Sequence, residues 1–440
     1  QDVKMAAGGE IINKGDVTSG TNMLMQAGTN IVNAGNLTSS AVGDNEGKAI
    51  ELTAETGSIT NTGSTITAAD GDILLSAKGS DAAKAFINNG SAINAATGSV
   101  TLEATGDIVN TGGVTSGLMA GLTSTSGSIT NSGAVNAIQD AMLMAAGSIN
   151  NSGSVNAGRD IGLTAANGDI SSTAALNAGQ NINAAVTNKG NIFFGAGAVA
   201  QNGDIGVTTN EGNITSSHID EDPEAQDVKL SALNGSVALY TKKGDIDFHA
   251  LYAANTASAA TDAGNITICS IDGDIVLLSN LDMNGQTSVK DVTVGSKLGL
   301  NTNLLTIGSL KQREGSTSMF LISPNSSRPD EPIGRFAIGS IEAPNGVRID
   351  KLWAREAEVH VDGGKFYIDK LSIVDVAHFS NRDMTTAVYG LPPLRDGSDS
   401  IFWNNAEDFN PKNALADWQR EGYIGNWMNL YFTDSYHMQI

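Results

Sequence analysis

Cysteine, proline, aromatic residues and charge are all scarce in this chain of 440 residues. The only cysteine is Cys269, so no disulfide can form within the chain. The strand-like residues beside Cys269 favour a small buried side chain over a reactive thiol. There are only 8 prolines, and aromatic residues make up 5% of the chain. Apolar residues still make up 40%, more than disordered chains usually carry, so the composition argues against disorder.

Positive charge is the scarcer sign, with 25 Lys and Arg against 47 Asp and Glu and a net charge of −22. This balance argues against nucleic acid as a partner and against electrostatic attachment to anionic lipid, and it permits cation binding. No apolar run reaches the length of a transmembrane helix, so we expect no integral membrane protein. No signal peptide stands at Gln1, where the sequence begins in mid-pattern. We therefore expect the segment to have been cut or matured from a longer chain.

Small residues and a short repeat fill the first two thirds of the chain, and residues 141–157 show the repeat most clearly. Leu143, Ile149 and Val155 alternate with small or polar residues, which is the period-two pattern of strands with one buried face. Asn-Ser-Gly and Ala-Gly-Ser supply residues that tolerate sharp corners. One such unit cannot bury its apolar face alone, so the pattern predicts a stacked solenoid.

Two sets of corner residues recur along the chain. Asn-x-Gly corners lie about 20 residues apart once two polar insertions, 41–48 and 79–85, are removed. Gly-Asp/Ser/Asn-Ile/Val steps form the second set, and each predicts a strand with an inward aliphatic residue two places after the glycine. Those aliphatic residues are Ile59, Ile73, Ile108, Ile129, Ile149, Ile170, Ile205 and Ile275. Because like residues stack in successive coils, we expect the corner asparagines to form hydrogen-bonded ladders.

The predicted fold is all-β, a parallel β-helix with about 20 residues per coil and two or three short strands in each. About 15 coils over residues 1–310, at roughly 4.8 Å each, would extend on the order of 70 Å. A leucine-rich horseshoe is excluded because its Leu-x-x-Leu-x-Leu pattern is absent.

The repeats at residues 59–68, 71–77, 106–112 and 127–133 resemble those of filamentous-haemagglutinin-type exoproteins, the adhesins of two-partner secretion. The resemblance covers roughly residues 1–280. It implies a right-handed parallel β-helix, exported through an outer-membrane transporter and displayed on the surface of a Gram-negative bacterium. The family's amino-terminal secretion domain, with its Asn-Pro-Asn-Leu type signature, is missing from this sequence.

An acidic insertion interrupts the repeats at residues 216–227. Asp220, Asp222 and Glu224 are close enough in sequence for a calcium site, because calcium prefers several carboxylate oxygens. The spacing matches neither an EF-hand nor the nonapeptide of calcium β-rolls, so a solvated loop without a metal is the favoured interpretation. No other cofactor is indicated.

The composition changes after about residue 310, where seven of the prolines and all four tryptophans lie. We expect a proline-bearing loop over 311–333, followed by wider terminal coils up to residue 380. Residues 381–440 lose the repeat, and they are predicted to contain a helix over 410–420 and a strand over 426–431. Trp403, Trp418, Trp427 and Tyr431 would cap the open end of the solenoid or, as the alternative, bind carbohydrate by stacking.

No catalytic motif stands out in the sequence. The histidines are not spaced as metal ligands, and no nucleophile elbow, phosphate loop or dinucleotide fingerprint lies in the right context. The nearest candidate for a glycan-active site is Asp245 with His249, joined by Asp274 a coil and a half later. Gly-Asp-Ile also recurs at Asp72, Asp107, Asp169 and Asp204, which favours ordinary corner residues and no enzyme.

These observations predict a structural and adhesive cell-surface protein, whose β-helical stalk mediates attachment between cells, in biofilm or to a host surface. Its expected partners are the outer-membrane transporter and a surface glycan or protein receptor. Three alternatives remain open: a self-assembling filament or surface-layer subunit, a polysaccharide-active enzyme, and the stalk of a contact-dependent toxin. Recognition is expected in the exposed loops 41–48, 79–85, 216–227 and 311–333 and in the aromatic C-terminal region.

Overall fold

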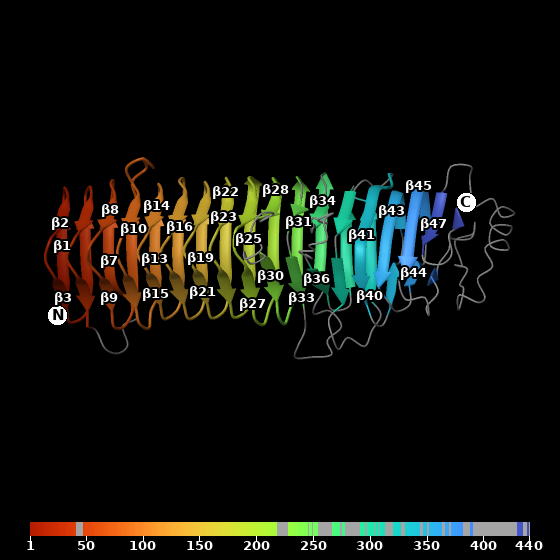
Figure 1. Ribbon diagram of the computed structural model, residues 1–440. Helices are drawn as coiled ribbons and strands as arrows, with labels where there is room; N and C mark the ends of the chain where they lie inside the picture. The colour runs from red at the N-terminus through yellow and green to blue at the C-terminus, as the bar shows by residue number, and fades with distance from the viewer. Residues whose placement is uncertain are drawn as a thin grey trace. The chain divides into compact units, whose positions relative to one another are not determined.

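In the computed structural model the chain is an all-β parallel β-solenoid of about 13 coils with about 21 residues each (Figure 1). The structure describes residues 1–40, 47–217, 228–244, 246–248, 250–253, 266–272, 275–277, 291–294, 297–302, 304–307, 309–312, 320–326, 331–343, 346–349, 352–362, 366–368, 371–381, 388–389, 429–433 and 438–439. No helix occurs among these residues, so none there is long and apolar enough to cross a membrane.

Each coil has three strands, as in the coil formed by β19 (Ala141–Ala145), β20 (Ile149–Asn151) and β21 (Val155–Ala157). Each strand pairs in parallel with its equivalent in the next coil, so that Leu143 faces Leu163 and Val155 faces Leu176. The pairing gives every backbone polar group of a strand a partner one coil away, which confirms the repeat predicted from the sequence.

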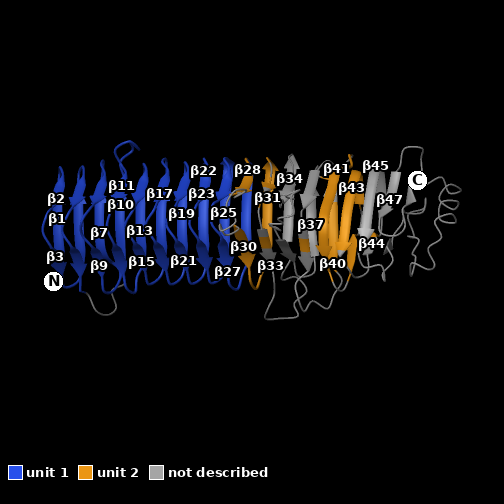
Figure 2. Ribbon diagram, viewed as in Figure 1, with its two compact units in different colours: residues 1–211 blue, residues 212–440 orange. Residues whose placement is uncertain are grey.

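The chain divides into two compact units, residues 1–211 and residues 212–440 (Figure 2). In the first unit, the first strands of successive coils are β1 (Val3–Ala7), β4 (Met23–Ala27), β7 (Lys48–Ala54), β10 (Asp72–Ala77), β13 (Val100–Ala104), β16 (Ala120–Ser124), β19, β22 (Ile161–Asn167), β25 (Ile182–Lys189) and β28 (Ile205–Glu211). The second strands are β2 (Ile11–Asn13), β5 (Ile31–Asn33), β8 (Ile59–Asn61), β11 (Ile87–Asn89), β14 (Ile108–Asn110), β17 (Ile129–Asn131), β20, β23 (Ile170–Ser172) and β26 (Ile192–Phe194). The third strands are β3 (Val17–Ser19), β6 (Leu37–Ser39), β9 (Ile66–Ala68), β12 (Ile93–Ala95), β15 (Val114–Ser116), β18 (Val135–Ala137), β21, β24 (Leu176–Ala178) and β27 (Ala198–Ala200).

In the second unit the strands are β29 (Ile214–Ser216), β30 (Lys229–Ala232), β31 (Val237–Lys243), β32 (Ile246–Asp247), β33 (Ala250–Ala253), β34 (Ile266–Asp272), β35 (Ile275–Leu277), β36 (Asp291–Val294), β37 (Lys297–Thr302), β38 (Leu304–Ile307), β39 (Ser309–Gln312), β40 (Phe320–Ser326), β41 (Ile333–Glu342), β42 (Val347–Ile349), β43 (Leu352–Asp362), β44 (Phe366–Ile368), β45 (Leu371–Asn381), β46 (Val388–Tyr389), β47 (Asn429–Thr433) and β48 (Met438–Gln439). Described neighbours pair in parallel except β47 and β48, which are antiparallel.

The core of the first unit is a set of stacked aliphatic columns. Leu143, Ile149 and Val155 are completely buried, as their alternation with small and polar residues predicts. The inward isoleucines that precede and follow them in the second column are equally buried: Ile59, Ile108, Ile129 and Ile170. Burial of one aliphatic side chain contributes about 1.5–3 kcal/mol, so stabilisation accumulates coil by coil.

A buried asparagine ladder runs beside the aliphatic columns. Asn110 Nδ2 donates to Asn131 Oδ1 at 2.7 Å, and Asn131 Nδ2 donates to Asn151 Oδ1 at 2.7 Å. The members are Asn13, Asn33, Asn61, Asn89, Asn110, Asn131 and Asn151, and the ladder ends on Ser172 Oγ. This confirms the predicted ladder, and it satisfies amide groups whose burial would otherwise cost several kcal/mol.

The carboxylates of the Gly-Asp-Ile steps are corner residues, as expected. The Asp72, Asp107 and Asp169 side chains accept backbone N–H groups of Ser99, Ser128 and Asn191 in the following coil, each at 2.7 Å. Each carboxylate thereby holds the corner of its neighbour in place.

Glycine is required at several of the Asn-x-Gly corners, Gly112 and Gly133 among them, because successive coils approach closely there. A Cβ on Gly112 would lie 2.0 Å from the carbonyl oxygen of Ser91, and one on Gly133 would lie 1.9 Å from that of Gly112. Gly113, the next residue, has no atom within 4 Å of that position. The corner therefore selects glycine by contact between backbones.

The second unit contains the terminal strands predicted from the alternation at residues 336–371. Of these, β41 and β43 are 10 and 11 residues long, longer than the strands of the first unit. The predicted loop over 311–333 is wrong in part, because 320–326 is the strand β40, which pairs with β42. Phe320 and Ile322 are completely buried, and this alternation outweighs the polar and proline content of the segment.

The described coils number about 13, against the 15 expected for residues 1–310, and coils of the second unit are longer, since Ile266 pairs with Leu298. Thr241 donates to the carbonyl oxygen of Gly212 across 29 residues of sequence. The predicted helix over 410–420 lies outside the described residues. Within the strand predicted over 426–431, residues 429–431 belong to β47. The domain boundaries at 310 and 380 stay predictions.

Candidate functional site

Most of the sequence-predicted site residues lie outside the described part of the chain. This applies to the aromatic residues Trp403, Trp418 and Trp427, to the calcium candidates Asp220, Asp222 and Glu224, and to Asp245, His249 and Asp274. Tyr431 lies in β47, in register with His378 and Gln439. Cys269 lies in β34, as the strand prediction required, in register with Tyr240. The structure therefore leaves these binding, metal and catalytic hypotheses as predictions.

Among the predicted recognition loops, 79–85 is fully described. It follows β10 and forms a turn in which the Asp81 carboxylate accepts the N–H of Ala83 at 3.1 Å and pairs with Lys84 Nζ at 3.0 Å. The hydrogen bond from Lys84 is the main cause that lowers the pKa of Asp81. The insertion is thus a locally closed polar turn.

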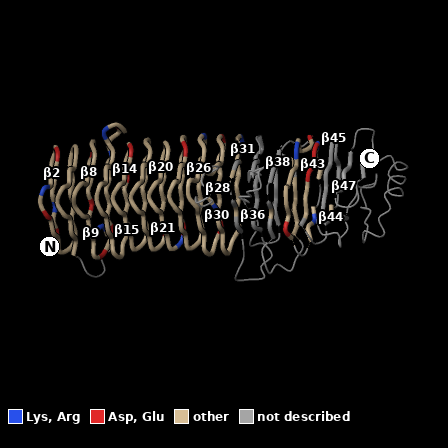
Figure 3. Tube along the Cα trace, in the orientation of Figure 1, with Lys and Arg blue, Asp and Glu red and all other residues tan. Residues whose placement is uncertain are grey.

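Titratable side chains are dispersed in the described residues, where no group of three His, Cys, Asp or Glu could hold a metal ion. The charged residues are sparse along the coils of the first unit (Figure 3). Only Asp107 and Asp140 are charged between residues 104 and 158. What distinguishes this surface is therefore its lack of charge.

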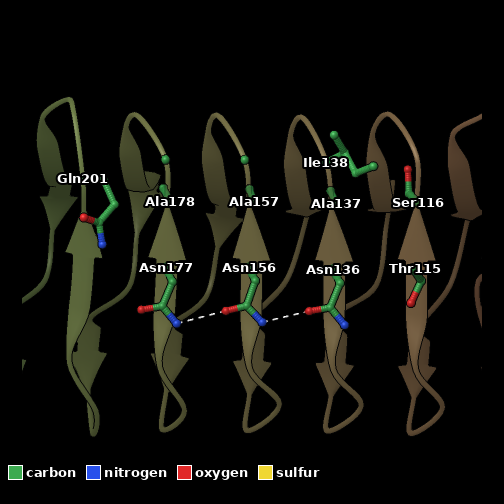
Figure 4. A pocket seen from close by; sticks show the side chains of 12 residues that line it. Thr115, Ser116, Asn136, Ala137, Ile138, Asn156, Ala157, Asn177, Ala178 and Gln201 are labelled. Carbon is green, nitrogen blue, oxygen red and sulfur yellow. Dashed lines mark hydrogen bonds between the residues drawn. The ribbon is translucent and has the colours of Figure 1, made fainter. Parts of the chain in front are cut away.

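A shallow groove of about 430 Å³ crosses this uncharged surface (Figure 4). It lies on the outer side of the third strands and spans five coils, from Thr115 on β15 to Gln201, which follows β27. At roughly 4.8 Å per coil, its length is about 20 Å. All of its lining residues belong to the first unit.

The floor of the groove is a second amide ladder, in which Asn136 and Asn156 are half-buried and Asn177 is exposed. Asn177 Nδ2 donates to Asn156 Oδ1 at 2.9 Å, and Asn156 Nδ2 donates to Asn136 Oδ1 at 2.8 Å. Figure 4 shows the three side chains in one row along the coil axis. The ladder is a flat, neutral surface with donors and acceptors in a fixed order.

One corner residue interrupts the small residues along the edge of the groove. Gly117, Ile138, Gly158 and Gly179 occupy equivalent positions, each donating its N–H to the last residue of the third strand in the preceding coil. The Ile138 side chain is 69% exposed, the highest value among the exposed large hydrophobic residues. It projects at the edge of the groove (Figure 4), where the two following coils carry Gly158 and Gly179 at the equivalent position.

Further exposed apolar residues gather in the same coils. Leu118 and Met119, which precede β16, are 39% and 37% exposed, and Met144 on β19 is 48% exposed. The backbone places Leu118 next to the Ile138 corner, because the N–H of Gln139 donates to the Leu118 carbonyl at 3.0 Å. Ile138, Leu118, Met119 and Met144 together are named the apolar patch below. Exposed apolar residues that gather in adjacent coils favour an interaction site.

One ion pair lies at the margin of the patch. Arg159 donates from Nε to Asp140 Oδ1 at 3.0 Å, and Asp140 Oδ1 also accepts the N–H of Asp160 at 3.2 Å. The hydrogen bond from Arg159 is the main cause that lowers the pKa of Asp140, and the same bond raises the pKa of Arg159. The pair neutralises the carboxylate closest in sequence to Ile138.

The fold and this surface define a β-helical repeat protein. Comparison with family models finds no match to the chain, and comparisons with curated proteins and with solved structures find none either.

Sequence reasoning missed the groove and the apolar patch. An isolated apolar residue in a repeat is normally assigned to the core, and Ile138 follows directly after the strand residues Val135 and Ala137. The available signal was positional, since Ile138 aligns with Gly158 and Gly179 once the coils are placed in register.

Proposed function

We propose that the protein is a structural and adhesive cell-surface protein, a β-helical stalk that mediates attachment between cells, in biofilm or to a host surface. The observation that supports this proposal is the separation of roles within each coil. Inward columns of aliphatic residues and asparagines stabilise the stack, while outward residues on the first and second strands vary between coils, as in the pairs Gly121–Met142, Thr123–Met144 and Thr130–Asn150. Such a scaffold carries binding residues without depending on them for its fold.

The resemblance of residues 59–68 and 127–133 to haemagglutinin-type repeats supports an extracellular location and export by an outer-membrane transporter of the two-partner type. The uncharged, polar outer face fits a protein that contacts neutral surfaces rather than nucleic acid or anionic lipid. No cofactor is part of the proposal, and we propose no catalytic activity.

The adhesive role is tested with beads that carry the full chain. Beads coated with the protein are expected to attach to bacterial cells of the same strain or to epithelial cells, while beads coated with albumin do not. The Trp403→Ala and Trp427→Ala variants ask whether the C-terminal region carries the adhesion. Attachment no better than that of albumin in every case would refute the adhesive role.

Location and enzymatic activity are tested separately. Protease added to intact cells is expected to digest the chain, and digestion only after lysis would refute surface display. Incubation with acidic polysaccharides is expected to yield no new reducing ends or unsaturated products. Turnover of an acidic polysaccharide that is lost in the Asp245→Ala variant would show that the protein is a glycan-active enzyme and not a stalk.

A further inference from the structure

The apolar patch and the groove are next to one another, and their shapes correspond. Ile138 projects from one corner, and the hollow at Gly158 and Gly179 begins one coil later on the same edge. The centre of the hollow is about one and a half coils from Ile138, which is about 7 Å at roughly 4.8 Å per coil. A projection and a hollow this close on one face can be exchanged between two copies related by a two-fold axis.

We propose that this face binds a second copy of the same chain, side by side and antiparallel, with Ile138 of each copy in the glycine-lined hollow of the other. The two-fold axis passes near Ala157, between the projection and the hollow. The amide ladders of the two copies then face each other, and each amide offers both a donor and an acceptor. This inference does not depend on the proposed adhesive function.

The distribution of charge also favours this face as the place where two copies of the chain meet. Two copies that each carry −22 repel one another wherever their carboxylates approach. Over residues 115–201, the coils that the groove crosses, the carboxylates are only Asp140, Asp160 and Asp169 against Arg159 and Lys189, and Asp140 is neutralised by Arg159. The coils around Ile138 are therefore a face on which two copies approach at little electrostatic cost.

The area of the face gives the expected affinity between the two copies. Five coils of about 4.8 Å, multiplied by a face of similar width, give about 500 Å² per copy. Stable interfaces bury about 800 Å² per partner, so the pair is expected to dissociate in the micromolar range or above. Exchange of Ile138 between copies would be its central apolar contact.

The first test is sedimentation of the full chain from about 1 µM to about 1 mM. The wild-type protein is expected to shift from monomer to dimer, and Ile138→Asp to weaken pairing at least about 100-fold, because a carboxylate would be buried without a partner. The matched control is Ile12→Asp. Ile12 is 54% exposed on β2, outside the patch, and its variant should pair as the wild type does.

Three results would overturn the proposal. The first is a wild-type protein that stays monomeric throughout the range, and the second is an Ile138→Asp variant that pairs normally. The third is a monomeric chain that binds a neutral glucan through this groove, with binding lost in Ile138→Asp, which would assign the groove to a glycan. Circular dichroism of each variant checks that a loss of pairing is not caused by unfolding.

Salt and crosslinking test the geometry. Raising the salt from about 0.05 M to 0.5 M should strengthen pairing by screening the like charges, whereas an interface built on ion pairs would weaken. In a Cys269→Ser background, the double variant Asn136→Cys/Asn177→Cys, which keeps Ile138, should oxidise to a closed covalent dimer, because the two ladder positions lie one coil on either side of the two-fold axis. Covalent ladders longer than a dimer would exclude the two-fold arrangement.

Discussion

Two asparagine ladders in the same coils differ in their exposure to water. Asn110 is completely buried, and it accepts from Asn89 while donating to Asn131 and to the carbonyl oxygen of Gly112. Asn177 is exposed and donates to Asn156. Their hydrogen bonds have nearly the same length, so any difference in their contribution to stability comes from desolvation.

The first prediction is that Asn110→Ala lowers the free energy of unfolding by at least about 3 kcal/mol. The substitution leaves the amide of Asn89 and the oxygens of Asn131 and Gly112 buried without their partner, at about 1–3 kcal/mol for each unsatisfied group. Asn177→Ala is the control and should cost less than about 0.5 kcal/mol, because water replaces the lost bond. Equal losses in urea denaturation would show that burial of the ladder is irrelevant.

The second prediction concerns Asp140, whose pKa is lowered in the fold by the hydrogen bond from Arg159. A lowered pKa means that the ionised form is favoured by folding. Its contribution is therefore present above the unfolded value of about 3.9 and is lost as pH falls through the lower folded pKa. Wild type should exceed Asp140→Asn in stability by up to about 1 kcal/mol at pH 7.

That difference should shrink when both proteins are melted near pH 2. The double variant Asp140→Asn/Arg159→Gln is the control, because it lacks both charges and should show no such change with pH. A difference between wild type and Asp140→Asn that is constant across the range would contradict the assignment of the pKa shift to this pair.

At the scale of the element, the corner is the most restrictive part of a coil. Its strands tolerate Ile, Val, Leu or Ala at inward positions, as in the pairs Val155–Leu176 and Leu176–Ala198. The corner glycines do not have this freedom where the backbone of the preceding coil occupies the space of a Cβ.

The third prediction compares neighbouring glycines at one corner. Gly112→Ala should destabilise the fold by about 1–3 kcal/mol, because the new Cβ meets the carbonyl oxygen of Ser91 and the coils must separate. Gly113→Ala should be neutral or stabilise by about 0.4–1 kcal/mol, because its Cβ would lie in open space. Denaturation midpoints of the two variants measure the contrast, and similar values would exclude the backbone contact as the cause.

Much of the fold was predictable because each coil repeats the same pattern of inward aliphatic residues and corner residues. Alternation identified the inward residues Leu143, Ile149 and Val155, and the Asn-x-Gly corners identified the buried ladder. The strand β40 was not predicted, because its pattern is three inward residues within a segment rich in proline and serine. Tertiary pairing with β42 stabilises it more than local composition opposes it.

The groove was less predictable, because its features depend on register rather than on residue type. Gly158 and Gly179 line the groove at the positions equivalent to Ile138, and the hydrogen bonds between coils establish that equivalence. The length of a coil varies from 20 to 28 residues. The sequence alone therefore does not show which residue of one coil lies next to which residue of the following coil.

At the scale of the molecule, the first unit behaves as a stack in which each coil contacts only its neighbours. Its stability is then a sum over coils and over the interfaces between them. Asn33 and Asn61 remain 2.8 Å apart although 28 residues separate them, so an insertion at a corner leaves the stack in register.

The fourth prediction is that one whole coil can be removed. Deletion of residues 129–148 joins Ser128 to Ile149, so that β20 replaces β17 beside β14 and β22 pairs with β16. The variant should fold with an unchanged β-sheet circular dichroism per residue. Deletion of residues 129–138 alone is the control, and it should unfold the region because the remaining strands lose their equivalents. Identical behaviour of the two deletions would contradict the coil as the unit of structure.

The buried asparagine ladder also gives the stack a direction. Asn110 and Asn131 each donate to a backbone carbonyl of their own coil, at Gly112 and Gly133, which fixes the side of the amide that carries hydrogen. Every amide in the row therefore points its N–H toward the C-terminal neighbour. A coil stacked in the reverse orientation would place the N–H group of its asparagine against the N–H group of the neighbouring asparagine. The donor and acceptor order of the ladder therefore fixes the direction in which each coil stacks on the one before it.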